Sequence, residues 1–181
     1  IVNRNPSGPF TTSTLQQVSS GRLGFVASRT MQIAQKLYQG IEIDGDTIGL
    51  ITYMRTDGTN LSTEAINTFR KYISTEFGEK YLPDTATSYS GKKAKNAQEA
   101  HEAIRPTDII RTPNMLKKYL SPDQYKLYDL IWNRALSSQM KPAQFDRNTI
   151  TIISDDNGTI CKASGSVIKF DGFLKVMKDN K

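Results

Sequence analysis

The sequence has 181 residues and a mass of 20.3 kDa, enough for one domain or a small domain with part of another, which excludes a large repeat protein. A net charge of +6 and an isoelectric point near 9.4 make a polyanion the first partner to consider. Hydrophobic residues make up 37% of the chain, so a packed core is possible. The apolar runs fall far short of the roughly 20 residues that span a bilayer, so no membrane is expected as a partner.

The first third of the chain predicts two helices and a hairpin. Residues 3–9 are structure breakers and indicate a linker. Helical spacing predicts one helix that starts at residue 12 or 13 and ends at Gly21, and a second that starts at the cap Ser28 and ends at Gly40. The second helix is expected to bury an apolar stripe: Met31, Ala34, Leu37 and Tyr38.

A hairpin and a third helix come next. Residues 41–43 and 47–53 predict two strands, the second of them largely buried and ending at Tyr53. The next helix is expected to start at the cap Ser62 and to end at Gly78. Tyr53 therefore lies where a strand passes into the connection to a helix.

Residues 83–96 are polar and include a lysine cluster at 92–95, which predicts a mobile loop on a basic edge. Residues 98–104 are expected to form two helical turns that Pro106 stops. On such a helix His101 and Arg105 share one face and form a donor pair suited to a phosphate. The alternative is an exposed helix face on which Arg105 pairs with a neighbouring glutamate.

Thr112 is expected to cap a brief helix, and Ser121 opens a capping box for the longest helix, which Pro142 stops. Antiparallel strands are then predicted at 149–153, 159–163 and 167–170, with a turn at Asn157 and Gly158. Because a lone hairpin is marginal in water, we expect these strands to belong to a sheet completed elsewhere in a longer protein.

The predicted fold class is α+β. A predominantly helical domain with a small hairpin bears Tyr53, and a few antiparallel strands of a β-rich domain follow it. The expected divisions are a linker, or a segment on the side of the β-rich domain, at 1–12, the helical domain at 13–140 and part of the β-rich domain at 141–181.

Composition restricts metal chemistry. Cys161 and His101 are the single cysteine and histidine, so a zinc site of four Cys and His ligands is impossible within this chain, and a reducing compartment is expected. Asp44 and Asp46 fit a hairpin turn better than a metal site, since no third acidic ligand is recognisable nearby. No metal ligand is therefore expected in this chain, and no glycine-rich pattern indicates a nucleotide cofactor.

The connection after Tyr53 places a phenol, a guanidinium, a hydroxyl and a carboxylate close together, on Tyr53, Arg55, Thr56 and Asp57. A phenolate is a nucleophile, but a reference pKa of about 10 makes it scarce at neutral pH unless a cation or a base helps. Arg55 can supply that charge and can grip a phosphate oxygen. The alternative is a buried tyrosine beside a surface ion pair of Arg55 with Asp57, and local chemistry on its own favours it.

Larger motifs reverse that preference. Tyr53 is followed by Met-Arg-Thr-Asp, and Gln-Glu-Ala-His-Glu-Ala-Ile-Arg-Pro comes at 98–106. These motifs are similar to those of bacterial DNA topoisomerases of the type IA family. The resemblance runs over most of the chain, with further matches at 9–17, 34–38 and 130–132. The family pattern commonly has Ser where this chain has Gly58, and this departure is expected to affect only a local hydroxyl contact or cap.

The resemblance implies that Tyr53 attacks a phosphodiester of single-stranded DNA and forms a transient 5′-phosphotyrosyl link. Another strand then passes through the break, and negative supercoils relax without ATP. Arg55 would bind the scissile phosphate, and His101 would contact a neighbouring backbone phosphate or support the site. The supporting DNA-binding positions would be Thr56, Asp57 and Arg105.

The resemblance also implies parts that lie outside this chain. The family enzyme uses Mg²⁺ held by a toprim domain, and nothing in this sequence matches that domain. We therefore expect the isolated chain neither to cleave nor to relax DNA. Residues 13–140 resemble the mobile lid that carries the tyrosine, and residues 141–181 resemble part of the arch that hinges it. The expected location is the bacterial cytoplasm, in association with the nucleoid.

Two other functions share parts of this chemistry. Tyrosine recombinases and type IB topoisomerases also use tyrosine, arginine and histidine, but their nucleophile follows the Arg and His cluster, whereas Tyr53 precedes both His101 and Arg105. The non-enzymatic rival is a basic DNA-binding module with a structural Tyr53, in which the first helix pair and the loop at 92–95 contact phosphates.

Overall fold

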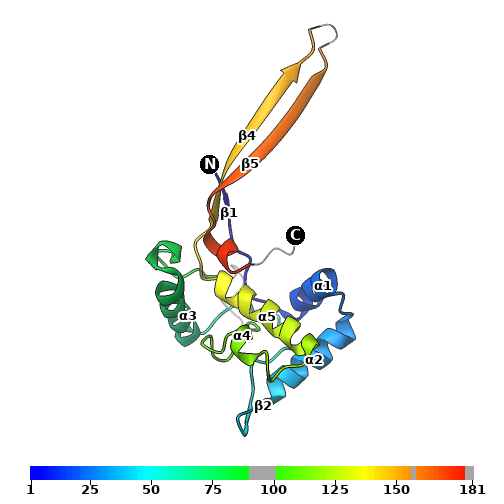
Figure 1. Ribbon diagram of the computed structural model, residues 1–181, viewed down its shortest axis with the longest axis vertical. Coiled ribbons are helices and arrows are strands. Elements are labelled where there is room, and N and C mark those ends of the chain that lie inside the picture. The colour runs from blue at the N-terminus through cyan, green and yellow to red at the C-terminus, as the bar shows by residue number, and fades with distance from the viewer. Residues whose placement is uncertain (90–100, 156–157, 178–181) are drawn as a thin grey trace.

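The computed structural model describes residues 1–89, 101–155 and 158–177. A helical body carries a long two-stranded arm (Figure 1). The elements in chain order are β1 (Val2–Arg4), α1 (Thr12–Leu23), α2 (Ala27–Gln39), β2 (Ile41–Ile43), β3 (Asp46–Ile48), α3 (Thr63–Phe77), the 3₁₀ turn η1 (Glu79–Tyr81), α4 (Pro113–Leu116), α5 (Pro122–Ser137), β4 (Ala143–Ile153), β5 (Ile160–Phe170) and the 3₁₀ turn η3 (Gly172–Lys175). The α+β fold class is confirmed.

Capping residues set most helix boundaries as expected. The Ser62 side chain accepts a hydrogen bond from the Ala65 N–H at the start of α3, and Gly78 ends that helix. Ser121 forms the predicted capping box at the start of α5. The expected start of α2 at Ser28 is wrong by two residues, because the helix begins at Ala27 behind Val26, which makes no side-chain cap.

The helix α5 lies at the centre of the body and packs against α1, α2 and α4. Its apolar stripe is mostly buried, and both polar aromatics that are buried in it have hydrogen-bond partners: Tyr128 donates its hydroxyl to the Arg111 carbonyl at 2.7 Å, and Trp132 donates its indole N–H to the Ile109 carbonyl at 3.0 Å. These two bonds fix the chain at residues 109–111 to the core.

The segment 101–106 is extended, so the helix predicted for 98–104 is wrong over its described residues. Isolated bridges pair Ile104 with Phe10, Pro106 with Ile51 and Glu102 with Asn60. These bridges give the backbone N–H and C=O groups of the segment their hydrogen-bond partners, and the extended chain also buries Ala103 and Ile104. Two helical turns that Pro106 would end offer less. His101 and Arg105 therefore do not share a helix face.

The small hairpin is shorter than predicted. The strands β2 and β3 pair Ile41 with Ile48 and Ile43 with Asp46, and β3 ends at Ile48 instead of Tyr53. Leu50 and Ile51 leave the hairpin and are buried in the body. Gly49 allows this departure, because a Cβ there would lie 2.8 Å from the Tyr38 carbonyl oxygen.

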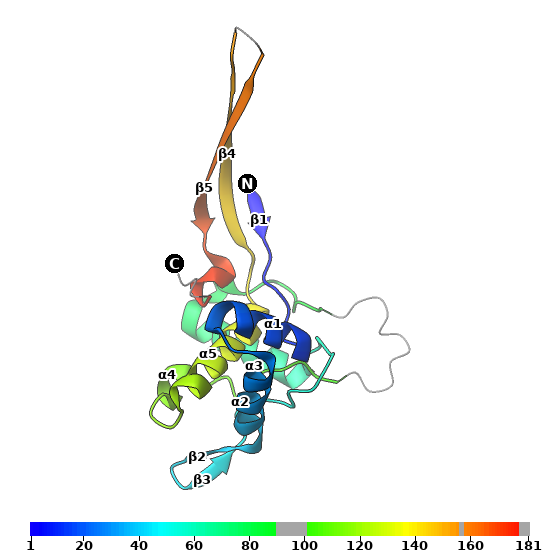
Figure 2. The same ribbon diagram turned by 90° about the vertical axis from the view of Figure 1, so that its right-hand side faces the viewer.

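The arm consists of β4 and β5, which pair antiparallel from Gln144 and Phe170 outward to Ile153 and Ile160 (Figure 2). The strands predicted at 159–163 and 167–170 are one continuous strand. Residues 2–4, which lie in the segment expected to be a linker or part of the β-rich side, form β1 and pair with β4 in a sheet of order β1-β4-β5. The partner strand, distant in sequence, explains why the breakers at 3–9 misled the prediction.

Three predictions fall on residues outside the described ranges: the lysine cluster at 92–95, the start of the predicted helix at 98–100, and Asn157 of the predicted turn. In the described part of the chain, no helix combines the length and the apolar character that a membrane crossing requires.

Candidate active site

The connection between β3 and α3 is hydrogen-bonded near both of its ends to one segment of chain, residues 101–107. At its start, Thr52 donates its N–H to the Arg105 carbonyl at 2.9 Å, and its hydroxyl donates to the Ala103 carbonyl at 2.8 Å. At its end, Ala103 donates its N–H to the Asn60 carbonyl at 2.8 Å. The two predicted motifs, around Tyr53 and around His101, therefore lie together although about fifty residues separate them in sequence.

Thr12, the first residue of α1, clamps the middle of this connection. Its hydroxyl donates to the Met54 carbonyl at 2.7 Å and accepts the Thr56 N–H at 2.8 Å, while its own N–H donates to the Thr56 carbonyl at 2.9 Å. Sequence reasoning assigned Thr12 only to a helix start. The sequence feature that could have identified Thr12 as a site residue is the family motif at 9–17. Phe10 of the same motif pairs with Ile104.

Burial alternates along the clamped residues. Met54 is 3% exposed and Thr56 is 8% exposed, whereas the side chain of Tyr53 is 47% exposed. Arg55 and Asp57 are exposed as well. The inward residues anchor the connection, so that Tyr53, Arg55 and Asp57 are accessible from outside.

These exposures contradict the alternative of a buried tyrosine. Tyr53 is not enclosed by the core, and within the described residues Arg55 and Asp57 form no ion pair with each other. Asp57, which was predicted to assist DNA binding, keeps its carboxylate exposed beside the Arg55 position.

Tyr38 supports the Tyr53 ring. The two ring centroids lie 5.3 Å apart at an interplanar angle of 62°, an edge-to-face contact that restricts the phenol without covering it. Tyr38 is 43% exposed, so the prediction that it lies in the buried stripe of α2 is wrong. It occupies the last turn of that helix, where its outward face meets the connection. Sequence periodicity could not distinguish a buried stripe from its edge.

Arg105 is held inside the molecule. Its guanidinium donates to both carboxylate oxygens of Glu102, from Nε at 2.6 Å and from Nη2 at 3.1 Å, and it donates from Nη1 to the Pro106 carbonyl at 3.0 Å. The Arg105 side chain is only 15% exposed. The geometry thus favours a role in holding the 101–107 segment.

Glu102 completes this arrangement, because its carboxylate also accepts the Ser62 N–H at 2.9 Å and ties the start of α3 to the segment. Burial raises the pKa of Glu102, but the hydrogen bonds from Arg105 and Ser62 outweigh burial and hold the pKa below its ordinary value. The ionised form is therefore the one that the fold stabilises.

We expect Glu102→Gln to lower the free energy of unfolding by about 1–2 kcal/mol at pH 7, because it removes charge-assisted hydrogen bonds. A lowered pKa means that the contribution of Glu102 is present above its unfolded pKa of about 4.3 and disappears as the pH falls through the lower folded value. Urea unfolding of parent and variant between pH 7 and pH 3 tests this. A difference that stays constant over that range would contradict it.

His101 packs on Gly58 through its backbone. A Cβ placed on Gly58 would lie 1.6 Å from the His101 carbonyl oxygen, closer than any side chain can approach. The absent serine at this position was expected to affect only a local hydroxyl contact or cap. The structure shows instead that Gly58 permits the close approach of the two motifs, with His101 exposed beside the connection.

We expect Gly58→Ala and Gly58→Ser to destabilise the protein by similar amounts, about 1–3 kcal/mol, because either Cβ forces the backbone at residue 101 to move. Thermal unfolding of the two variants measures the effect. Gly21→Ala is the matched control, since a Cβ there meets no atom within 4 Å. An unchanged midpoint for Gly58→Ala would show that the close approach is not required.

The described residues contain no group of three or more His, Cys, Asp or Glu side chains that could hold a metal ion. The residues of the candidate site therefore do not fit a Mg²⁺ site, and no step is assigned to a metal held by them.

Comparison with known proteins identifies the family. A sequence model of a family described as DNA topoisomerase matches residues 2–181. DNA topoisomerase 1 of Rickettsia felis is 52% identical over 177 residues, which cover 98% of this chain and 23% of that protein. The chain belongs to the bacterial type IA DNA topoisomerases.

Other members give the same result. DNA topoisomerase 1 of Xylella fastidiosa is 46% identical over 179 residues, which cover 98% of this chain and 22% of that protein. The structure of full-length topoisomerase I from Thermotoga maritima matches with a TM-score of 0.85 and 42% identity over 99% of this chain and 28% of that chain. The chain thus spans between a fifth and a third of the length of these topoisomerases.

Proposed function

We propose that Tyr53 is the nucleophile that cuts one strand of DNA. Its phenol oxygen attacks the phosphorus of a phosphodiester, the bond to the 3′-oxygen breaks, and the downstream strand becomes joined to Tyr53 through its 5′-phosphate. The phenol loses its proton and the released 3′-oxygen gains one. Because one phosphoester replaces another, the 3′-hydroxyl can reverse the step and reseal the strand without ATP.

The observation that carries this proposal is the exposure of Tyr53 and Arg55 on one firmly held connection. A guanidinium two residues from the phenol can hold the non-bridging oxygens of the phosphate and offset the charge that grows on them. Because Thr12 and Thr52 already hold the connection in place, its backbone loses little conformational entropy when DNA binds.

The remaining predicted residues receive different roles in this proposal. His101 and Asp57 are exposed and can meet the DNA beside the scissile phosphate. Thr56 is buried and its hydroxyl accepts the Gly58 N–H at 3.0 Å, so we assign it to the shape of the connection. We assign Arg105 to positioning His101 through the 101–107 segment.

Strand passage requires the cut end to move, and we propose that the helical residues 13–140 move relative to residues 141–181. The two parts share one apolar core, and hydrogen bonds cross between them. Lys141 donates its N–H to the Tyr81 carbonyl at 2.8 Å, and the Tyr81 hydroxyl donates to Asp171 at 2.9 Å. At Gly172, with φ +50°, a Cβ would lie 2.4 Å from the Pro142 carbonyl oxygen, so glycine allows the strands to leave the body here.

Further parts of the same polypeptide complete the proposed enzyme. The described residues contain no cluster of three or more candidate metal ligands, and we propose that Mg²⁺ and an acid for the leaving 3′-oxygen come from a toprim domain elsewhere. The substrate would be single-stranded regions of negatively supercoiled DNA. Such a substrate would place the enzyme with the nucleoid in the bacterial cytoplasm.

A trapping experiment tests the proposal. A single-stranded oligonucleotide labelled at its 3′ end is mixed with the intact polypeptide and Mg²⁺, and the reaction is stopped with detergent, since the protein remains on the 3′ piece. We expect a labelled protein band with the intact enzyme and none with the 181-residue chain alone. An adduct on the isolated chain would contradict the need for the other domains. DNA binding without any adduct on the intact enzyme would instead favour a non-catalytic DNA-binding module.

A further inference from the structure

The two faces of the arm differ in the middle of the sheet. Successive strand residues alternate in side, and directly paired residues share a side. One face therefore carries Arg147 with Ser166 and, one step outward, Thr149 with Ser164. The opposite face carries Ile150, Ile152 and Val167 together with the polar Asp146 and Asn148, and the exposed Ile153, Ile160 and Ile168 lie on the face with Arg147. Apolar side chains are therefore exposed on both faces, and the polar stretch that holds Arg147, Ser164 and Ser166 is confined to one of them.

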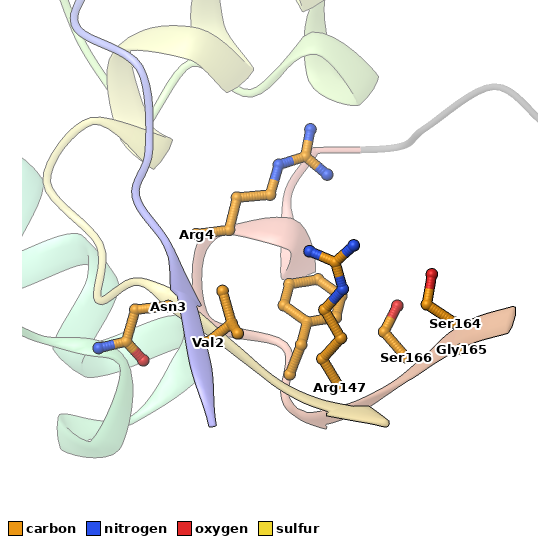
Figure 3. A pocket seen from close by; sticks show the side chains of 8 residues that line it. Val2, Asn3, Arg4, Arg147, Ser164, Gly165 and Ser166 are labelled. Atoms are coloured by element: carbon orange, nitrogen blue, oxygen red, sulfur yellow. The ribbon is translucent and has the colours of Figure 1, made fainter. Parts of the chain in front are cut away.

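A groove of about 450 Å³ lies on this polar face at the base of the arm, where β1 joins β4. Figure 3 shows Arg4 from β1 and Arg147 from β4 pointing to the same side, with Ser164 and Ser166 next to them on β5. The ring of Phe145 also lines the groove. We call this the arm groove.

The two arginines of the arm groove are not neutralised. Neither Arg4 nor Arg147 forms an ion pair with a carboxylate in the described part of the chain. Asp146, the acidic neighbour of Arg147, projects to the opposite face and pairs there with Lys169 at 2.9 Å. The groove therefore presents two guanidinium groups, hydroxyls and an aromatic ring without an acidic side chain in its lining.

The basic surface continues toward the helical body. Arg4 also lines a second recess of about 80 Å³, together with Arg22 and Arg134. Arg134 donates Nε–H to the Gly8 carbonyl at 2.6 Å, and its guanidinium lies 4.9 Å from the centre of the Phe10 ring. Burial lowers the pKa of Arg134, and the charge of Arg22 adds to that effect.

We propose that the arm groove binds the backbone of single-stranded nucleic acid at a site separate from the Tyr53 connection. Arg4 and Arg147 hold successive phosphates, Ser164 and Ser166 donate hydrogen bonds to them, and Phe145 receives a base. A charged groove with an aromatic side chain is the combination that binds single strands with little sequence preference. The inference rests on the proposed DNA substrate, but not on covalent attack by Tyr53.

The test is DNA binding by the intact enzyme that carries Tyr53→Phe, so that covalent capture makes no contribution. Fluorescence anisotropy with a labelled oligothymidylate, at several salt concentrations, compares Arg4→Gln/Arg147→Gln with the parent. The matched control is Lys71→Gln/Lys126→Gln, which removes two exposed charges elsewhere on the body. The pair Arg4→Lys/Arg147→Lys keeps the charge and shows whether the fold tolerates substitution.

We expect the glutamine pair to weaken binding about tenfold and to lower the salt slope by about 1.4, since each phosphate contact on a single strand contributes about 0.7. The lysine pair is expected to keep the slope of the parent, and Phe145→Leu to weaken binding about tenfold at an unchanged slope. Equal losses in the glutamine pair and the control, or an unchanged slope, would overturn the proposal. So would tighter binding of a duplex of the same length. Formation of the adduct by the enzyme with native Tyr53 is read separately and reports on the proposed cleavage.

Discussion

Tyr53→Phe is expected to abolish the covalent DNA adduct and the relaxation of supercoiled DNA by the intact enzyme. The substitution removes one oxygen atom, the proposed nucleophile, and keeps the ring that packs edge-to-face on Tyr38. Because Tyr53 is exposed, its hydroxyl is not needed by the core, so the fold and the affinity for single-stranded DNA are expected to stay within about twofold of the parent. Gel assays of adduct and relaxation, with anisotropy for binding, measure all three quantities.

Tyr125→Phe is the matched control. Tyr125 also carries its hydroxyl at the surface, where it lies 3.4 Å from Asn114, and it is far along the chain from the candidate site. We expect this variant to cleave and relax DNA like the parent. Adduct formation that survives in Tyr53→Phe would transfer the reaction to another residue and overturn the assignment.

Arg55→Gln is expected to give the second largest effect, a decrease in the cleavage rate of about a hundredfold or more. Loss of one preorganised group that stabilises charge in a transition state typically has this magnitude. Arg55 is exposed and forms no ion pair among the described residues, so the variant is expected to unfold at the same temperature as the parent. Single-turnover cleavage at saturating DNA separates this effect from weaker binding.

Arg55→Lys distinguishes charge from geometry. A lysine keeps the positive charge but loses the planar fork that holds two phosphate oxygens, so partial recovery of the rate is expected. Arg29→Gln is the control at a distance, because Arg29 is engaged by Asp123 on the surface of the body. A cleavage rate in Arg55→Gln equal to that of the parent would remove Arg55 from the reaction.

Local signals predicted the helices well. Ser62 and Gly78 define α3, and Ser121 starts α5, through bonds between nearby residues that a sequence displays directly, although α5 ends at Ser137, before the predicted stop at Pro142. The segment 101–106 could not be predicted in this way. Its partners are Phe10, Ile51 and Asn60, and the pairing with them outweighs a helical pattern that looks favourable in isolation.

In the candidate site, too, local features could be predicted and contacts between residues distant in sequence could not. Tyr53 and Arg55 were found because their residue types carry the chemistry and lie two positions apart. The resemblance to topoisomerases then decided between two local interpretations. Thr12 and Tyr38 were missed as site residues, since their roles depend on where α1 and α2 end up in space. The exposure of Tyr53, which separates a nucleophile from a core tyrosine, is also a property of the folded chain alone.

Mass spectrometry of the trapped adduct tests the central claim most directly. The intact enzyme is stopped during cleavage of an oligonucleotide, digested with nuclease and protease, and searched for peptides that retain a nucleotide. We predict a nucleotide attached through its 5′-phosphate to the phenol oxygen of Tyr53 and to no other residue. A nucleotide on a different side chain, or one attached through a 3′-phosphate, would contradict the account.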